Sequence, residues 1–267
     1  MEPTFNLQEY VTKLRTMYTA DIAQGTFNLL LIGGIGDGKT HLTSTARKPI
    51  VYHSFDPGGT KLPCIKRLTD EGMCIIDTRF EKEDPTNPTA FDLWDKEFRA
   101  LVKTDFFQHI GTYVIDSFSL WMDACINKLA KIGGRKGGVL EIQDWQILRN
   151  VMRDSIKLCT AIPCDFICTG HLVQEMETFS GKFVSSFQAP PSLQNALPAL
   201  FDEIWVIRAI ENAQTKKSER LIYSSPTGKV QARTRIGSEK FSNPETVPDI
   251  KVLLTKAGMA TDDKPKL

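Results

Sequence analysis

The sequence predicts an α/β fold built on a mostly parallel β-sheet, and three observations indicate it. Residues 33–40 read Gly-Gly-Ile-Gly-Asp-Gly-Lys-Thr and directly follow the apolar run of residues 27–32. Apolar runs then alternate with segments of helical spacing, as in the strand–helix–strand units of a parallel sheet. The 267-residue chain is also long enough for one large α/β domain, or for one domain with a small appendage.

Apolar spacing and chain-breaking residues define the elements in order. Near-helical spacing predicts a lead-in helix before Gly25, and the strand of residues 27–32 follows it. After the glycine-rich segment we expect a helix over residues 41–47, which Pro49 ends. Four further apolar runs predict strands over residues 50–55, 73–77, 112–117 and 166–171. Three amphipathic segments predict helices over residues 90–103, 120–131 and 143–161.

The last third of the chain predicts a different arrangement of strands. Residues 203–208 and 220–224 are expected to pair with each other at the sheet edge. We therefore divide the chain into a lead-in helix (1–24), a core (25–240) and a C-terminal extension (241–267). Its final residues, 261–267, are expected to fray.

The glycine-rich segment matches the phosphate-binding loop pattern G-x-x-x-x-G-K-[ST], which predicts nucleoside triphosphate binding. Glycines let the backbone turn tightly, so that successive N–H groups point at phosphates near the positive end of a helix. We assign Lys39 to the β- and γ-phosphates and the Thr40 hydroxyl to Mg²⁺, so ATP and Mg²⁺ are the expected cofactors. The other predicted nucleotide contacts surround these two residues: Gly33, Gly34, Gly36, Asp37, Gly38 and His41.

Carboxylates at the ends of later strands complete the expected site. Asp116 ends an apolar strand and is predicted to hold Mg²⁺ or its water, although an acid there also suits a helix cap. For the group that activates the attacking water we select Asp56, with Asp77 and Glu81 as competitors. Asp56 precedes Pro-Gly, so it is equally an ordinary turn former. His171 ends another strand and is a candidate sensor of the γ-phosphate.

In this order, the motifs resemble those of the RecA/RadA-like ATPase superfamily. More narrowly, the chain resembles phage nucleotide-binding proteins of the Sak4 type, which anneal and recombine single-stranded DNA. The matching segments are residues 33–40, 113–117, 144–145, 169–171 and 197–203. The resemblance implies a RecA-like core: a mostly parallel, twisted sheet flanked by helices, with antiparallel edge strands near the C-terminus. Where the family pattern has a catalytic glutamate after the second strand, this chain has Asp56.

The resemblance further implies that two loops hold single-stranded DNA. Residues 132–138 combine glycines with two cations, Arg135 and Lys136. Residues 173–196 combine a cation with aromatic rings for base stacking: Lys182, Phe183 and Phe187. Either segment is also compatible with an ordinary surface loop.

Proteins similar to RecA bind ATP between subunits, so the resemblance implies a homo-oligomer, either a ring or a filament. Arg233 and Arg235 resemble the basic pair that reaches the γ-phosphate of the neighbouring subunit, although solvated arginines on an exposed strand give the same pattern. A single-strand-binding protein is a further candidate partner.

Several functional classes share these features. The leading interpretation is a DNA-dependent ATPase that promotes annealing or strand exchange, and a hexameric ring translocase or helicase uses the same core. A small-molecule P-loop kinase needs an arginine-bearing lid and an acceptor pocket, neither of which we identify. A nucleotide-dependent binding module is favoured if Asp56 does not support hydrolysis.

Bulk properties add only weak constraints. The formal net charge is +1, so any DNA binding depends on local patches. The six cysteines form no C-x-x-C pair, which favours reduced thiols. No apolar run approaches the length of a membrane span, so we expect a cytoplasmic protein without a membrane partner.

Overall fold

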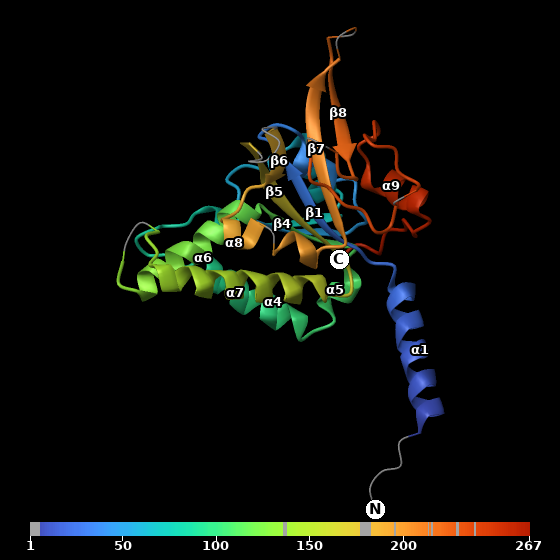
Figure 1. Cartoon of the computed structure of the whole chain (residues 1–267), viewed down its shortest axis with the longest axis horizontal. Helices are drawn as coiled ribbons and strands as arrows, with labels where there is room; N and C mark the ends of the chain where they lie inside the picture. The colour runs from blue at the N-terminus through green and yellow to red at the C-terminus, as the bar shows by residue number, and fades with distance from the viewer. Residues whose placement is uncertain are drawn as a thin grey trace, which may run out of the picture.

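The computed structural model describes residues 6–135, 138–176, 183–194, 196–212, 214, 216–227, 230–237 and 239–267. Within them, an eight-stranded β-sheet forms the centre of the protein (Figure 1). Its strands are β1 (Asn28–Gly33), β2 (Ile50–Ser54), β3 (Cys74–Asp77), β4 (Thr112–Asp116), β5 (Asp165–Met176), β6 (Phe183–Phe187), β7 (Glu203–Glu211) and β8 (Ser218–Tyr223).

The sheet order is β3-β2-β4-β5-β1-β7-β8, with β6 paired to β5 outside this path. From β3 to β7 every neighbouring pair is parallel, whereas β8 runs antiparallel to β7 and β6 antiparallel to β5. The predicted fold class, including antiparallel edge strands near the C-terminus, is therefore confirmed. In a parallel sheet the carboxyl ends of the strands meet at one edge, which is where ligands bind.

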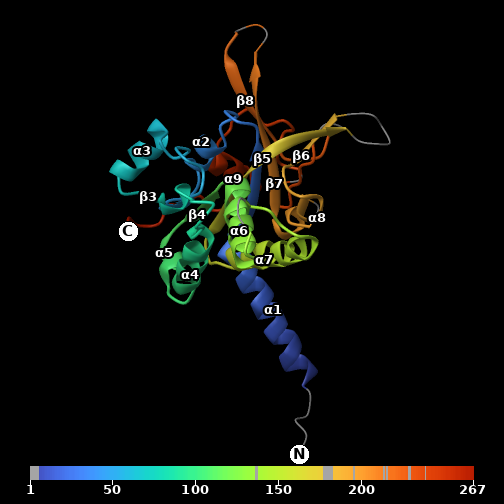
Figure 2. The same cartoon turned by 90° about the vertical axis from the view of Figure 1, so that its left-hand side faces the viewer.

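Helices cover both faces of the sheet. The helices of the described residues are α1 (Leu7–Gln24), α2 (Lys39–Thr43), α3 (Pro63–Asp70), α4 (Ala90–Val102), α5 (Phe106–His109), α6 (Phe118–Ile132), α7 (Ile142–Thr160), α8 (Pro191–Gln194) and α9 (Ile250–Ala257). Short 3₁₀ turns lie at Arg79–Glu81 and Pro198–Leu200. Helix α1 extends away from the body in both views (Figures 1 and 2). None of the helices in the described residues combines the length and hydropathy of a membrane span.

Two hydrophobic clusters hold β1 in place from its two faces. Leu30 and Ile32 belong to the cluster formed with α4, α6 and α7, which is rich in aromatic side chains such as Trp121. Leu29 and Leu31 belong to the cluster formed with α2, α3 and α9. Successive strand residues point to opposite faces, so a strand covered on both sides is a continuous apolar run. This packing fixes the end of β1, where the glycine-rich loop begins.

The helix after the glycine-rich loop is shorter than predicted, because α2 ends at Thr43. The next residues read Thr43-Ser44-Thr45, and each hydroxyl donates to the carbonyl oxygen three residues earlier, at 2.8, 2.7 and 2.7 Å. Such side-chain bonds compete with the helical hydrogen bonds of the backbone. The chain therefore leaves the helix well before Pro49.

Two residues of the C-terminal segment contact the body of the protein. The carboxylate of Asp263 accepts from the backbone N–H of Lys48 at 2.7 Å. The Lys264 ammonium donates to the carbonyl oxygens of Gln108 and Ile110 at 2.8 and 2.6 Å. These carbonyls lie at the end of α5, where helical partners are missing, and a cation satisfies them. The division of the chain at residues 24 and 240 stays a prediction.

Candidate nucleotide-binding site

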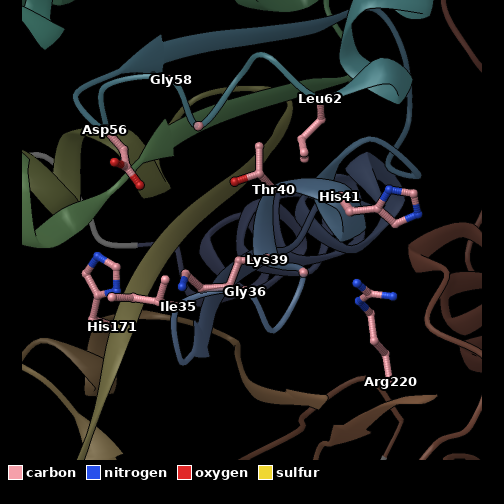
Figure 3. Close-up of a pocket in the computed structure, with 12 residues that line it drawn as sticks. Ile35, Gly36, Lys39, Thr40, His41, Asp56, Gly58, Leu62, His171 and Arg220 are labelled. Carbon is pink, nitrogen blue, oxygen red and sulfur yellow. The ribbon is translucent and has the colours of Figure 1, made fainter. Parts of the chain in front are cut away.

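A cavity of about 600 Å³ lies at the carboxyl edge of the sheet, where β1 ends (Figure 3). Half of its lining comes from the glycine-rich loop and the start of α2. Asp56 and the two glycines after it contribute from the loop that follows β2. Leu62, before α3, also lines the cavity, and His171 of β5 and Arg220 of β8 complete the wall. The topology thus brings together segments that are far apart in the sequence.

Lys39 lies in the mouth of the glycine-rich loop. Its ammonium donates to the carbonyl oxygens of Gly33 and Gly34, both at 3.0 Å, and the side chain is 8% exposed. Burial lowers the pKa of Lys39, while Asp116, Asp37 and Asp56 raise it in part. The loop therefore surrounds a largely desolvated cation, which suits the binding of a phosphate chain.

Asp37 shapes the loop and does not line the cavity. One carboxylate oxygen accepts from the backbone N–H of Gly34 at 2.6 Å, and the other accepts from the N–H of Ala209 on β7 at 3.0 Å. Gly36 and Gly38 both have left-handed backbone angles, with φ of 81° and 99°, which favour glycine. The carboxylate of Asp37 therefore braces the loop against β7. The predicted nucleotide contact of Asp37 stays a prediction.

Asp116 is almost completely buried, at 1% exposure, and both of its carboxylate oxygens are used. The Thr40 hydroxyl donates to one at 2.7 Å, and the Thr169 hydroxyl donates to the other at 2.5 Å. Thr169 reaches Asp116 because β5 lies between β1 and β4 in the sheet. The arrangement places the two residues that were predicted to hold Mg²⁺ in direct contact.

The donor set suits Mg²⁺, which prefers oxygen ligands and is bound by one or two carboxylates together with substrate phosphates. The Thr40 hydroxyl and the Asp116 carboxylate, with its neighbour Thr169, would hold the ion or its waters. In the described residues no group of three or more His, Cys, Asp and Glu side chains could hold a metal ion. A metal here therefore depends on nucleotide oxygens to complete its shell, and it would neutralise the phosphate charge.

Of the three carboxylates proposed to activate water, Asp56 is the one that lines the cavity. Burial and the nearby Asp116 raise the pKa of Asp56, while His171 and Lys39 lower it in part. Asp77 instead pairs with Arg79 at the end of β3. Glu81 accepts from the Ser54 hydroxyl at 2.7 Å.

His171 lies at the level of Gly33, the last residue of β1, and lines the cavity. Burial lowers the pKa of His171, and the neighbouring Lys39 lowers it further. A neutral imidazole at this place can donate or accept a hydrogen bond at the phosphate end of the site. Its role as a γ-phosphate sensor stays a prediction.

A family model described as an AAA domain matches residues 27–236 of the chain. The chain belongs to this AAA-domain family. The match takes in the glycine-rich loop, Asp116 and His171, and together with this geometry it makes the protein an AAA-type P-loop ATPase. Nucleotide binding is a property of the family, and Mg²⁺ is its typical metal.

Solved structures include a similar chain, a KaiC-like protein from the hyperthermophilic archaeon Pyrococcus horikoshii OT3. The two share 15% sequence identity with a TM-score of 0.44, over 84% of this chain and 87% of the archaeal one. No match was found among curated protein sequences.

In the ATPase, Arg233 and Arg235 lie away from the cavity of their own chain. Arg233 pairs with Ile204 near the start of β7, level with Leu30 and three residues before Gly33 on β1. Its guanidinium donates to the carbonyl oxygen of Pro198 at 2.9 Å, and Arg235 forms an ion pair with Asp202 at 3.1 Å. The predicted action of both arginines on a neighbouring subunit stays a prediction.

Two residues of the predicted DNA loops make contacts within the protein. The Arg135 guanidinium forms ion pairs with Asp144 and Glu141, which join its loop to the start of α7. Phe187 is 3% exposed and packs against Phe118, with ring centroids 4.8 Å apart. These placements differ from our expectation, because loop composition does not reveal which side chains turn inward. Lys136, Lys182 and the side chain of Phe183 lie outside the described residues.

Arg220 is a residue of the site that the sequence did not reveal. It lies on β8 opposite Ala209, and a Cβ atom added to Gly38 would be only 2.5 Å from its Nε. The arginine reaches the ATPase cavity because β8 pairs with β7, and β7 pairs with β1. No local motif marks this contact, because it depends on the order of three strands.

Proposed function

We propose that this ATPase binds single-stranded DNA and promotes its annealing or strand exchange, with ATP turnover coupled to the β5–β6 hairpin. The resemblance to phage annealing proteins supports the choice of DNA as partner. The observation that carries the coupling is the continuity of β5. Thr169 contacts Asp116, His171 lines the cavity, and from Leu172 onward the same strand pairs with β6.

This continuity gives a direct route from the nucleotide to the predicted DNA segment. The segment of residues 173–196 begins within β5, two residues after His171. Figure 2 shows the β5–β6 and β7–β8 hairpins projecting from the body on the side away from α1. A shift of the β5 backbone at the phosphate end therefore moves the β5–β6 hairpin directly, because β5 is itself one strand of that hairpin.

ATP hydrolysis with and without a single-stranded oligonucleotide tests the proposal. DNA is expected to stimulate the wild-type rate, and Lys39→Ala is expected to remove turnover in both conditions because it deletes the cation in the loop. The double variant Lys182→Ala/Phe183→Ala should keep the rate without DNA. It should raise the DNA concentration for half-maximal stimulation by about tenfold or more, since stacking one base contributes roughly 1–3 kcal/mol.

The control for the hairpin variant is Lys216→Ala, which removes a cation near the end of the other hairpin, where Lys216 pairs with Glu211. It should leave the DNA response unchanged. Turnover that depends on Lys39 but ignores DNA would reject the DNA partner and favour a kinase or another motor. An unchanged DNA response in the double variant would exclude this hairpin as the contact.

We also propose that two copies of the chain share each ATP. Arg235 is 54% exposed and, with Arg233, lies near the amino-terminal end of β7, while the cavity lies at the carboxyl edge of the sheet. In a head-to-tail assembly, one edge of each subunit faces the opposite edge of the next. Arg235 is then positioned to stabilise charge on a neighbour's nucleotide, as arginine fingers do.

Mixing two inactive variants tests this arrangement. Lys39→Ala and Arg235→Ala are each expected to lose turnover, the second by about a thousandfold. In a random mixture, about one quarter of head-to-tail interfaces combine an intact loop with an intact arginine, so part of the rate should return. Mixing Lys39→Ala with Asp116→Asn, two defects on the same side of the interface, should restore nothing. Failure of the first mixture to recover, with co-assembly verified, would contradict the shared site.

A further inference from the structure

We infer that Arg220 binds the phosphate chain of the nucleotide from within the same subunit, at the end of the cavity away from Asp56. This inference rests on nucleotide binding by the ATPase and is independent of DNA. The chemical class recognised is the α-phosphate end of a nucleoside di- or triphosphate.

The cavity has two chemically different ends. Figure 3 shows Asp56 and His171 on one side of the glycine-rich loop, and His41 and Arg220 on the other. Asp56 is the candidate base at the first end, and Thr40 with its Asp116 contact marks the predicted metal position. Because the metal and the attacking water belong with the β- and γ-phosphates, the α-phosphate extends toward the second end.

The Arg220 side chain lies against the loop, and among the described residues it lacks the hydrogen-bond and ion-pair partners of a structural arginine. Its Nε is buried and has no hydrogen-bond partner within the part of the chain that the structure describes. By contrast, Arg208 on the neighbouring strand donates to the Ser185 hydroxyl, and Arg47 is paired with Asp165. A guanidinium that faces a cavity with unused donors matches the oxygens of a phosphate group.

Strand geometry explains why Arg220 points at the loop. Alternate residues of a strand share one face, so Arg220 and Ile222 point the same way. Ile222 is buried in the cluster that contains Leu42 of α2, which places Arg220 on the α2 side of the sheet. Arg220 is also opposite Ala209, whose N–H donates to Asp37 in the loop. The β7–β8 hairpin therefore positions the loop and the guanidinium together.

The test compares affinities for ATP, ADP and inorganic tripolyphosphate in the full-length wild type, Arg220→Gln and Arg220→Lys. Arg220→Gln is expected to weaken all three by about tenfold or more, the effect of losing a charged hydrogen bond. Arg220→Lys should recover part of that loss because it keeps the charge. Arg208→Gln, on the same hairpin, should bind all three ligands like the wild type. Without ligand, Arg220→Gln should melt no lower than the wild type, since an unpaired buried donor is removed.

Three outcomes would overturn the inference. Unchanged affinities in Arg220→Gln would show that the guanidinium does not contact the nucleotide. Loss for ATP and ADP with retained tripolyphosphate binding would indicate a contact with the base or ribose instead. Loss for ATP and tripolyphosphate with retained ADP binding would move the contact to the γ-phosphate. A failure of nucleotide binding itself appears differently, as wild-type protein that binds none of the ligands or binds them as weakly as Lys39→Ala.

Discussion

Replacing Asp116 by asparagine is expected to lower ATP turnover by about a thousandfold or more, because a metal ion at this place contributes several kcal/mol to the transition state. The substitution keeps the size of a side chain that is 1% exposed, but it removes the negative charge. It also replaces an acceptor with a donor, so either Thr40 or Thr169 loses the oxygen to which it now donates. Both losses fall on the residues that would hold Mg²⁺.

Nucleotide titration separates the metal from the phosphate contacts. In the presence of a chelator, Asp116→Asn should bind ATP at least as well as the wild type, because it no longer repels the phosphates. Added Mg²⁺ should strengthen ATP binding by the wild type and leave the variant unchanged. Asp95→Asn, which alters an exposed ion pair with Arg99, is the control and should behave as the wild type. A variant that still responds to Mg²⁺ would place the metal elsewhere.

Replacing Asp56 by asparagine is expected to lower kcat by about a hundredfold or more, the usual contribution of a general base. The affinity for ATP should change little, since the loop and Asp116 remain. In the wild type, burial and Asp116 raise the pKa of Asp56 above 3.8. The carboxylate that accepts a proton is lost as the pH falls through this raised pKa. The decrease of kcat at acidic pH should therefore have its midpoint above pH 3.8. A series of kcat measurements at different pH values tests this.

The matched controls are the two competing carboxylates. Asp77→Asn disturbs the pair with Arg79, and Glu81→Gln disturbs the bond from Ser54. Both variants should retain most of the rate, because neither side chain lines the cavity. A loss of rate in Glu81→Gln with a retained rate in Asp56→Asn would transfer the assignment to Glu81.

The parts of the site that the sequence predicted are those that local pattern determines. The positions of Lys39 and Thr40 follow from the loop and its preceding strand, and Asp116 follows from the end of an apolar run. Parallel strands then deliver Asp56 and His171 to the same edge without further information. The fold class was predictable for the same reason, since strands covered on both faces are continuous apolar runs.

The remaining features depend on contacts between distant segments. Arg220 reaches the site because β8 pairs with β7. Phe187 is buried beside Gly170, where a Cβ atom would be 2.6 Å from the phenylalanine ring, so the ring packs there only because Gly170 has no side chain. Arg135 forms ion pairs with Glu141 and Asp144 at the start of α7. One local signal was available, since three consecutive hydroxyls from Thr43 to Thr45 favour the early end of α2.

The brace at Asp37 has a consequence for how the protein acquires its binding ability. The two amides that Asp37 joins, those of Gly34 and Ala209, are separated by most of the chain. A nascent chain that has formed only the first strand–loop–helix unit contains every motif residue of the loop but lacks the strand that holds it in shape. We therefore expect competence to bind nucleotide to arise late in folding, when β7 has joined the sheet.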